Sequence, residues 1–323
     1  MRIIDTFMFA DIEEFPLFVA KVLSEESVVD QFIVIEASHT FKGKPRDFIL
    51  QKLVDSDSLL MHLRDRISVV EVPNLLDEVE FEGFLKKSLI FISQNLSGHD
   101  FYRTKRAIQE RRNFNIERFQ RNQAVPYLIE LGIRESDWVA ITDVDEIIDG
   151  SLNTRAKLLR DALHSTNGPI VHLKRQRYVF DIDNLDGRVR WIPIIKAKFI
   201  LQKEFKSLLR YRVPDIGIMQ PFFPTIVFEF SYCFTNLGIE NKLKSFSHKT
   251  PPIEWVQTAL NLNHQILYKS TRPESIAWFS KIVPSPESHP EYILSNLSNY
   301  KTNIINPLYE LERKRKYPEY FKK

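Results

Sequence analysis

Apolar residues recur along the start of the chain in two alternating patterns. Residues 3–9 form an almost continuous apolar run, residues 15–23 repeat apolar positions at helical spacing, and residues 31–36 are apolar and β-branched before a final acid. Buried strands and amphipathic helices have these respective patterns. The chain is therefore predicted to open with a strand–helix–strand unit, which is typical of a parallel α/β sheet.

The alternation of strand and helix signals continues to about residue 173. Gly132 is a plausible stop for the long helical region that precedes it. In order, the pattern predicts a helix near 57–66, a strand at 67–72, mainly helix over 77–131, a strand at 138–142, a helix at 154–163 and a strand at 169–173.

The second half of the chain has a shorter, more β-like pattern. Residues 178–234 are broken up by prolines, residues 252–268 have helical spacing, residues 272–290 form a Pro/Ser-rich loop, and a short amphipathic helix begins at residue 303. We therefore expect an α/β protein with a Rossmann-like, mostly parallel central sheet flanked by helices. We divide it into a catalytic domain, residues 1–250, and a C-terminal helical extension with a basic tail, residues 251–323.

Positive charge is concentrated at one end of the chain. The 45 Lys and Arg against 42 Asp and Glu give +3, but residues 311–323 alone hold six cations and two acids. The first 310 residues therefore sum to −1, which argues against a nucleic acid as the main ligand. The cations and aromatic residues of the tail would allow weak contact with an anionic membrane surface, with a solvated tail as the alternative.

Composition argues against several other classes of protein. The chain has nine glycines and contains neither GxGxxG nor GxxxxGK[ST], so a dinucleotide-binding loop or a P-loop is not expected. The one cysteine, Cys233, fits a reducing compartment. Acids occur too early for a signal peptide, and no apolar run approaches the twenty residues of a transmembrane helix. We therefore expect a cytoplasmic protein without a transmembrane segment.

Three Asp-x-Asp triplets occur, and their contexts differ. Residues 55–57 lie in a polar stretch that suggests a helix start, and residues 181–183 lie in DIDNLDG, which suggests a hairpin turn. Asp143 and Asp145 follow WVAIT, so a buried strand delivers them to its carboxyl end, where α/β sheets bind ligands. Two such carboxylates can hold one hard cation that also binds phosphate oxygens. His248 is the best candidate for a third ligand, with a surface or packing role as the alternative.

A second cluster, residues 99–123, combines seven Arg or Lys with three acids and four aromatic residues. On a helix, Arg118, Arg121 and Asn122 would lie on adjoining turns and could place guanidinium groups against a phosphate ester. The alternatives are a solvated helix face with ion pairs such as Glu117 to Arg121, or a surface for single-stranded nucleic acid.

Two carboxylates are candidates for general acid/base chemistry. Glu36 ends the second predicted strand, and Glu229 lies inside the apolar run TIVFEFSYCF. If Glu229 faced inward, burial would disfavour its charged form and make it a proton acceptor of raised basicity. Because Glu229 alternates with Phe228 and Phe230, a position facing solvent is also compatible with the pattern.

Five segments, taken in order, resemble glycosyltransferase family 17. They are IDTFMF, VVDQFIVIEASHTFKGKPRDF, ERFQRN, WVAITDVDEI and FSYCFTNLGIENKLKSFSHKT, and together they span about residues 3–250. The resemblance implies a GT-A-like fold that binds a nucleotide sugar through Mn²⁺ or Mg²⁺ and transfers the sugar with inversion to give a β-linkage. The family includes the eukaryotic enzyme that adds the bisecting N-acetylglucosamine to N-glycans, so the expected donor is UDP-N-acetylglucosamine.

The resemblance also implies roles for individual residues. Asp145 is expected to be a direct metal ligand and to act in catalysis, Asp143 to contact the metal or the ribose, and His248 to be a further metal ligand. Glu229 is the preferred general base. The residues expected to bind the donor are Asp5, Glu36, Thr40, Lys44, Arg118, Arg121, Asn122 and Asp143.

The chain departs from the family pattern next to the expected base. Where many members have Trp-His before Phe-Ser, this chain has Phe228-Glu229, so a role of that histidine would pass to Glu229 or be lost. The expected acceptor is a glycan or another hydroxyl compound. Two alternatives remain open: a sugar nucleotidyltransferase or metal-dependent phosphodiesterase, which can use the same carboxylate pair, and a nucleic-acid-binding or nucleic-acid-modifying protein.

Overall fold

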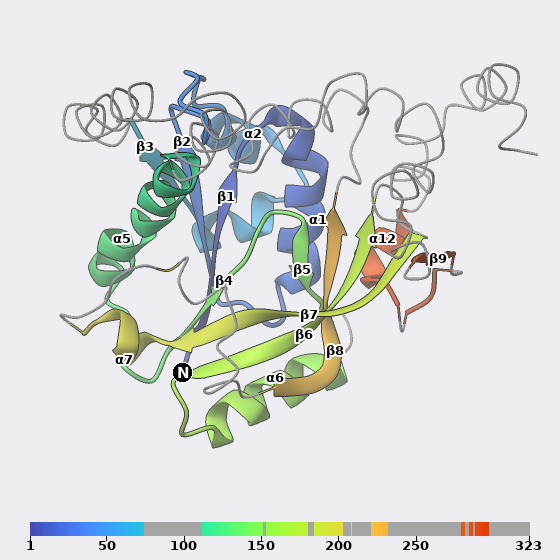
Figure 1. The fold of residues 1–323 in the computed structure, drawn as a ribbon. Helices are drawn as coiled ribbons and strands as arrows, with labels where there is room; N and C mark the ends of the chain where they lie inside the picture. Colours follow the sequence, from blue (N-terminus) through green and yellow to red (C-terminus); the bar gives the residue numbers. More distant parts are fainter. Residues whose placement is uncertain are drawn as a thin grey trace, which may run out of the picture.

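The strands form one mixed sheet with helices on both faces (Figure 1). Nine strands are present in the described residues, in the order β3-β2-β1-β4-β7-β6-β8-β5, with β9 paired to β7. The expected α/β class is confirmed. The structure is a computed structural model, and it describes residues 1–73, 112–150, 153–179, 184–202, 208, 221–231, 279–281, 284–286 and 288–296.

The first half of the sheet is parallel. Strands β1 (Ile3–Phe9), β2 (Gln31–Ala37), β3 (Ile67–Val72) and β4 (Trp138–Ile141) pair as neighbours with the same direction. Strand β1 is buried on both faces, which explains its continuous apolar run. Because the chain builds β2 and β3 on one side of β1 and then returns to place β4 on the other, the strand order reverses at β1.

The second half of the sheet mixes directions. Four pairs are antiparallel, β4 with β7, β5 with β8, β6 with β7 and β7 with β9, whereas β6 and β8 are parallel. The expectation of a mostly parallel sheet is therefore wrong here. A four-residue connection such as the one from β6 to β7 can join antiparallel strands, but a parallel pair needs a longer crossover. These strands are β5 (Glu146–Ile148), β6 (Ile170–Val179), β7 (Asn184–Lys196), β8 (Pro221–Ser231) and β9 (Phe279–Lys281).

Three prolines that were expected to interrupt strands lie inside them. Pro193 is in β7, and Pro221 and Pro224 are in β8. Pro193 and Pro221 both stand opposite His172 of β6, so the missing N–H groups fall at one position of the ladder. The β6–β8 register then shifts between Leu173 and Arg175, as a bulge allows. The last part of the predicted hairpin turn, from Asn184, belongs to β7, and residues 180–183 lie outside the described residues.

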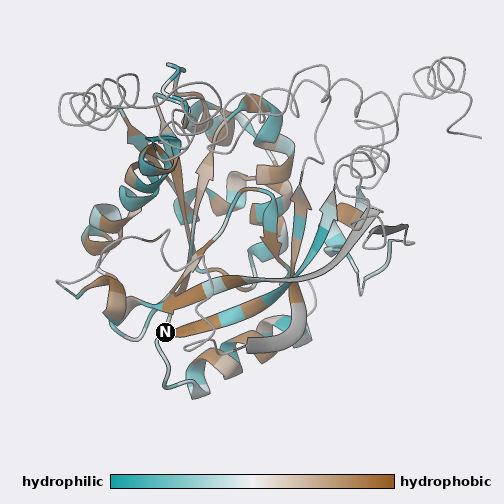
Figure 2. Cartoon of the chain, viewed as in Figure 1, coloured by the Kyte–Doolittle hydropathy of each residue, from teal (hydrophilic) through white to brown (hydrophobic). Residues whose placement is uncertain are grey.

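Side chains alternate across the sheet and divide the core into two layers. Along β1, Ile3, Phe7 and Phe9 pack into the first layer, and Ile4 and Met8 into the second. Figure 2 shows the apolar strands between the helices. The first layer is covered by α1 (Phe15–Glu25), α2 (Leu50–Ser56), the 3-10 helix η2 (Met61–Arg66) and α6 (Asn153–Ser165); the second is covered by helical residues 112–122, α5 (Ala124–Glu130) and α7 (Ala197–Ile200).

The helix expected at residues 57–66 is only partly present. Helix α2 ends at Ser56, because Asp57 has an extended backbone, and η2 supplies a 3-10 turn for the rest of the range. Leu50 and Val54 are the buried residues of α2, four positions apart as an amphipathic helix requires. A second 3-10 helix, η1 (Ile12–Glu14), leads from β1 into α1.

Two elements of the C-terminal range, β9 and α12, pack against the first 250 residues. Strand β9 pairs with β7 inside the range predicted as a loop, and α12 (Glu291–Ser295) contacts α1. The predicted helices at 252–268 and from residue 303 lie outside the described residues. The division at residue 250 therefore stays a prediction. None of the helices in the described part of the chain is long and apolar enough to cross a membrane.

Candidate functional site

The candidate site lies at the carboxyl ends of β1 and β4, where the strand order reverses. Open α/β sheets bind ligands at such a switch point. Residues 142–146, which follow β4, are named here the aspartate turn. Three backbone hydrogen bonds hold it: from the Thr142 N–H to the Thr6 carbonyl at 3.1 Å, from the Glu146 N–H to the Asp143 carbonyl at 3.0 Å, and from the Phe230 N–H to the Asp145 carbonyl at 2.8 Å. The predicted placement of Asp143 and Asp145 at a strand end is confirmed.

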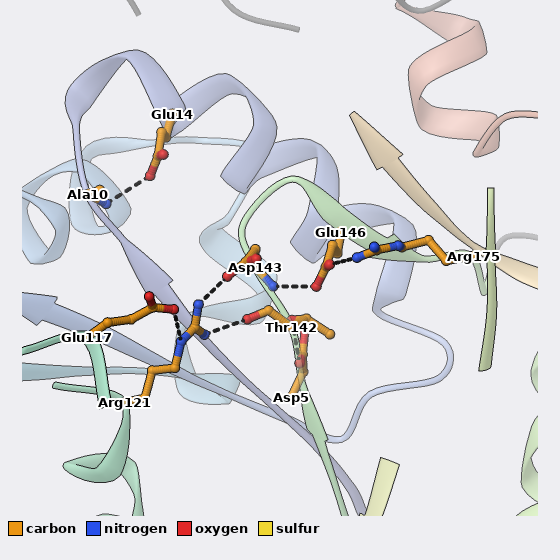
Figure 3. A network of polar contacts seen from close by, with 9 residues as sticks. All are labelled: Asp5, Ala10, Glu14, Glu117, Arg121, Thr142, Asp143, Glu146 and Arg175. Carbon is orange, nitrogen blue, oxygen red and sulfur yellow. Dashed lines mark hydrogen bonds and ion pairs between the residues drawn. The ribbon is translucent and has the colours of Figure 1, made fainter. Parts of the chain in front are cut away.

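Arg121 binds the aspartate turn from the second core layer (Figure 3). Its guanidinium group donates to the Thr142 carbonyl at 3.1 Å and to the Asp143 carboxylate, and its Nε donates to Glu117 at 3.1 Å. Arg121 is buried, whereas Asp143 is partly exposed. The arginine therefore neutralises one of the two aspartates and carries a buried positive charge to the end of the sheet.

A chain of ion pairs leads from the aspartate turn across β5, β6 and β8. Glu146 accepts a hydrogen bond from the Asp143 N–H at 2.8 Å and pairs with Arg175 of β6. Arg175 Nε lies 2.9 Å from Glu229 Oε2, an ion pair whose angles are not those of a hydrogen bond. Arg177 Nε lies 2.9 Å from Glu229 Oε1. The network thus places the aspartate turn and Glu229 in one connected group.

Glu229 faces inward, which was one of the two orientations that the pattern left open. Only 8% of its surface is exposed. Its surroundings nevertheless differ from the apolar ones assumed for a strong base, because Arg175 and Arg177 stabilise its charged form.

Asp5 occupies the interior of the first core layer. It is fully buried, accepts a hydrogen bond from the Thr142 hydroxyl at 2.8 Å, and lies 2.6 Å from the Lys21 ammonium group. Burial lowers the pKa of Lys21, but Asp5 and Glu25 outweigh burial and raise that pKa overall. Donor binding by Asp5 stays a prediction, and its observed contacts are with other buried residues.

Glu36 stabilises the start of a helix. Its carboxylate accepts hydrogen bonds from the N–H groups of Ile49 at 2.9 Å and Leu50 at 3.1 Å, at the first turn of α2. Such a carboxylate satisfies N–H groups that have no partner within the helix. Burial raises the pKa of Glu36, and these two N–H groups oppose the rise. This is a structural role beside the donor role expected for Glu36.

Thr40 and Lys44 close a tight loop beyond β2. The Thr40 N–H donates to the Lys44 carbonyl at 2.8 Å, and the Lys44 N–H donates to the Thr40 hydroxyl at 3.1 Å. Gly43, with φ of 77°, allows the turn between them. The Lys44 side chain is exposed, and donor binding by Thr40 and Lys44 stays a prediction.

Three predicted site residues remain: Arg118, Asn122 and His248. Arg118 is exposed on the helix that carries Arg121, and Asn122 accepts a hydrogen bond from the Leu208 N–H at 3.1 Å. His248 lies outside the described residues. Its role as a metal ligand stays a prediction.

The two aspartates fit a divalent metal by the type of atom that they offer. Carboxylate oxygens are the ligands that Mg²⁺ and Mn²⁺ prefer, and Asp143 and Asp145 are separated by one residue just after β4. Asp143 is partly exposed, whereas Asp145 is buried. Within the described residues, no group of three or more His, Cys, Asp and Glu is arranged to hold a metal ion.

Sequence reasoning missed three cations of this site: Lys21, Arg175 and Arg177. Lys21 stands in the apolar run FPLFVAKVL of α1, with Glu25 four residues later. A lysine at a core-facing position with an acid one turn away is a recognisable signal of a buried ion pair. Arg175 and Arg177 alternate along β6, which indicates one face of the strand.

A protein-family model matches more than half of the chain. A model described as glycosyltransferase family 17 matches residues 75–263, which is 189 of the 323 residues and more than half of the chain. The matched range contains both aspartates of the turn and Arg121 but excludes β1 and β2. No curated protein matches the chain.

Proposed function

The chain belongs to glycosyltransferase family 17, and from this we propose that it transfers N-acetylglucosamine from UDP-N-acetylglucosamine to a hydroxyl acceptor with inversion, with the help of Mn²⁺ or Mg²⁺. Membership of the family makes the protein a glycosyltransferase, which uses a glycosyl donor and an acceptor. A sugar nucleotidyltransferase, a phosphodiesterase or a nucleic-acid-modifying protein is thereby set aside. The donor, the metal, the inversion and a GT-A-like fold belong to the proposal.

The observation that carries the proposal is the pairing of Arg121 with the aspartate turn at the switch point of the sheet. Breaking the bond from sugar to diphosphate leaves negative charge on the diphosphate, which is the main electrostatic demand of the reaction. Asp143 and Asp145 would hold a divalent metal, which would supply electrostatic stabilisation of that charge. Arg121 adds a fixed, buried guanidinium group beside them.

The acceptor side of the proposal rests on Glu229. The proton of the acceptor hydroxyl must go to a base, and Glu229 is connected to the aspartate turn through Arg175 and Glu146. Its two arginine neighbours keep Glu229 ionised and ready to accept a proton, at the expense of basicity. General base catalysis contributes about 10²–10⁴-fold to such reactions. A glycan is the proposed acceptor, and a cytoplasmic location stays a prediction.

Release of UDP from UDP-N-acetylglucosamine tests the proposal. We expect slow hydrolysis of the donor that Mn²⁺ stimulates and that Asp145→Ala reduces by about 10²-fold or more, in line with loss of a group that stabilises developing charge. The measurement is UDP formed over time by the purified full-length chain, with and without 1,4-linked chitooligosaccharide or N-glycan acceptors.

Asp55→Ala is the matched control. It alters another Asp-x-Asp triplet in an exposed part of α2, far along the chain from the turn, and should leave UDP release unchanged. The proposal fails if the wild-type chain neither releases UDP nor shows a higher melting temperature with UDP-N-acetylglucosamine and Mn²⁺. Equal loss of activity in the two variants would also contradict it.

A further inference from the structure

Lys21 is a charged residue in the interior of the protein that the proposed reaction does not use directly. It is fully buried on α1, and Phe7 lies against it with the ring centroid 4.8 Å from Nζ. Its ammonium group contacts Asp5 Oδ2 at 2.6 Å, Glu25 Oε1 at 2.7 Å and the Glu146 carbonyl at 2.5 Å. An ammonium group has three N–H donors, and these contacts use all of them.

The contacts of Lys21 reach the aspartate turn by two routes and the end of β5 by a third. One is direct, to the Glu146 carbonyl. The second runs through Asp5, which accepts from the Thr142 hydroxyl at 2.8 Å. The third runs through Glu25, which accepts from the Ile148 N–H at 2.7 Å. Residues 142, 146 and 148 therefore bracket Asp143 and Asp145 and are all fixed to one ammonium group.

Lys21 and Arg121 hold the turn from opposite faces of the sheet. Lys21 comes from α1 in the first core layer, and Arg121 comes from the helix over the second layer. Arg121 contacts the Thr142 carbonyl, whereas the Lys21 network contacts the Thr142 hydroxyl through Asp5. Without the Lys21 network, the turn would keep Arg121, its backbone hydrogen bonds and the Glu146–Arg175 ion pair, but it would lose its side-chain link to α1.

Fold stability alone does not account for a lysine at this position. Taking a charge out of water costs several kcal/mol, and a buried ion pair is often no more stabilising than apolar residues of the same size. The neighbouring positions of α1, such as Phe18 and Val22, are apolar and fully buried. A methionine would fill the space, but it could not bind residues 142–148.

We propose that Lys21 is a positioning residue that holds Asp143 and Asp145 in the geometry that binds the metal and the UDP part of the donor. The inference rests on the proposed function, because it takes these aspartates as the donor site. Residues that orient metal ligands from behind typically change metal affinity or activity by about 10–100-fold when they are substituted. We expect a loss of that size in Mn²⁺-dependent UDP binding.

Two variants test the role of Lys21. Lys21→Met removes the ammonium group, and Thr142→Val removes only the hydroxyl that joins the turn to Asp5. Isothermal titration of UDP in the presence of Mn²⁺, followed by donor hydrolysis, should show about 10–100-fold weaker UDP binding. The change should appear mainly in KM, because the groups that act on the reacting atoms are still present.

Thr6→Val is the matched control for Thr142→Val. Thr6 is also a buried threonine, but its hydroxyl donates to the Ala140 carbonyl of β4 at 2.9 Å and not to the turn. UDP binding should be retained in this variant. If Lys21→Met does not fold, the comparison of the two threonine variants decides the matter.

The outcomes separate the two hypotheses. If wild-type protein does not bind UDP with Mn²⁺, the proposed function fails. If wild-type protein binds UDP and both Thr142→Val and folded Lys21→Met bind it as tightly, the role of Lys21 is wrong and the proposed function stands. A loss of binding in Thr6→Val equal to that in Thr142→Val would also overturn it, because a general loss of packing would then explain both.

Discussion

At the scale of single residues, the buried cluster of Asp5, Lys21 and Glu25 contains one cation and two carboxylates. One ammonium group cannot compensate two buried negative charges. Glu25 Oε1 accepts both of the hydrogen bonds described for its carboxyl group, and Oε2 is buried without a hydrogen-bond partner in the described residues. Burial raises the pKa of Glu25 well above its ordinary value, against the opposing effect of Lys21. Burial thus favours the protonated form of Glu25.

The raised pKa of Glu25 predicts a pH dependence of the free energy of unfolding. Because the folded protein binds the Glu25 proton more tightly than the unfolded chain, this contribution is greatest at acid pH. It is lost as the pH rises from about 4.5 through the folded-state pKa, by about 1.4 kcal/mol for each pH unit between the two values. Glu25→Gln, which copies the neutral form, should lose this dependence.

The melting temperature of Glu25→Gln relative to wild type, measured from pH 5 to pH 9, checks this expectation. The difference should grow in favour of the variant as the pH rises. Glu130→Gln serves as control because Glu130 is exposed on α5, and its difference from wild type should be flat. A flat difference for Glu25→Gln would mean that Glu25 is ionised in the folded protein.

At the scale of elements, α1 is the support of the aspartate turn and of β5 behind it. Lys21 binds Glu146, and the Gly150 N–H donates to the Ser24 carbonyl at 2.9 Å. The Ser27 hydroxyl in turn donates to the Gly150 carbonyl at 2.5 Å. The end of β5 therefore lies directly against the end of α1, and the close approach depends on the absence of a side chain at residue 150.

Gly150→Ala should consequently destabilise the protein. The added Cβ would overlap the Ser27 hydroxyl and come within 2.5 Å of Val28 Cγ2. Overpacking of this kind typically costs about 1–3 kcal/mol, so urea unfolding should show a lower midpoint with an unchanged slope. Because the turn is supported by the same helix, UDP binding should weaken as well.

Gly132→Asn is the control for that substitution. Gly132 has φ of 65° and no atom within 4 Å of an added Cβ, and asparagine tolerates this backbone region. Its free energy of unfolding should stay within about 0.5 kcal/mol of wild type. If Gly150→Ala were as stable as this control, the space between α1 and β5 could accommodate a methyl group without loss of free energy of unfolding, and the prediction would be wrong.

At the scale of the whole molecule, the described residues 288–296 pack against the sheet and α1. His289 is fully buried and lies against Tyr178 of β6, with ring centroids 4.5 Å apart. The Tyr178 hydroxyl donates to the Ser288 carbonyl, and Ile293 of α12 is fully buried. These contacts indicate that residues 288–296 unfold together with the sheet.

Ile293→Ala tests whether the chain unfolds as one unit. Loss of a buried isoleucine side chain typically costs about 2–5 kcal/mol, and calorimetry should show one unfolding transition at a lower temperature. Glu291→Ala, at an exposed position of the same helix, should leave the transition in place. Two transitions, of which only one moves, would instead support a separate C-terminal domain.

Local patterns of apolar residues were sufficient to predict several strands and the position of the aspartates. Strand 3–9 could be predicted because a strand that is buried over its length is largely apolar, and strand 67–72, which is only partly buried, because it is rich in β-branched residues. The four-residue apolar run of β4 places Asp143 just beyond a strand end. The spacing of apolar residues is a property of neighbouring positions, so it can be read without knowledge of the rest of the chain.

The charges that meet at the site, and the directions of the later strands, could not be predicted from such local patterns. Arg121, Lys21 and Arg175 lie 22, 122 and 32 positions from Asp143 in the sequence, and strand order alone brings them together. The inward position of Glu229 depended on the partner strands of β8. Such partners follow from the arrangement of the whole sheet, which apolar periodicity does not encode.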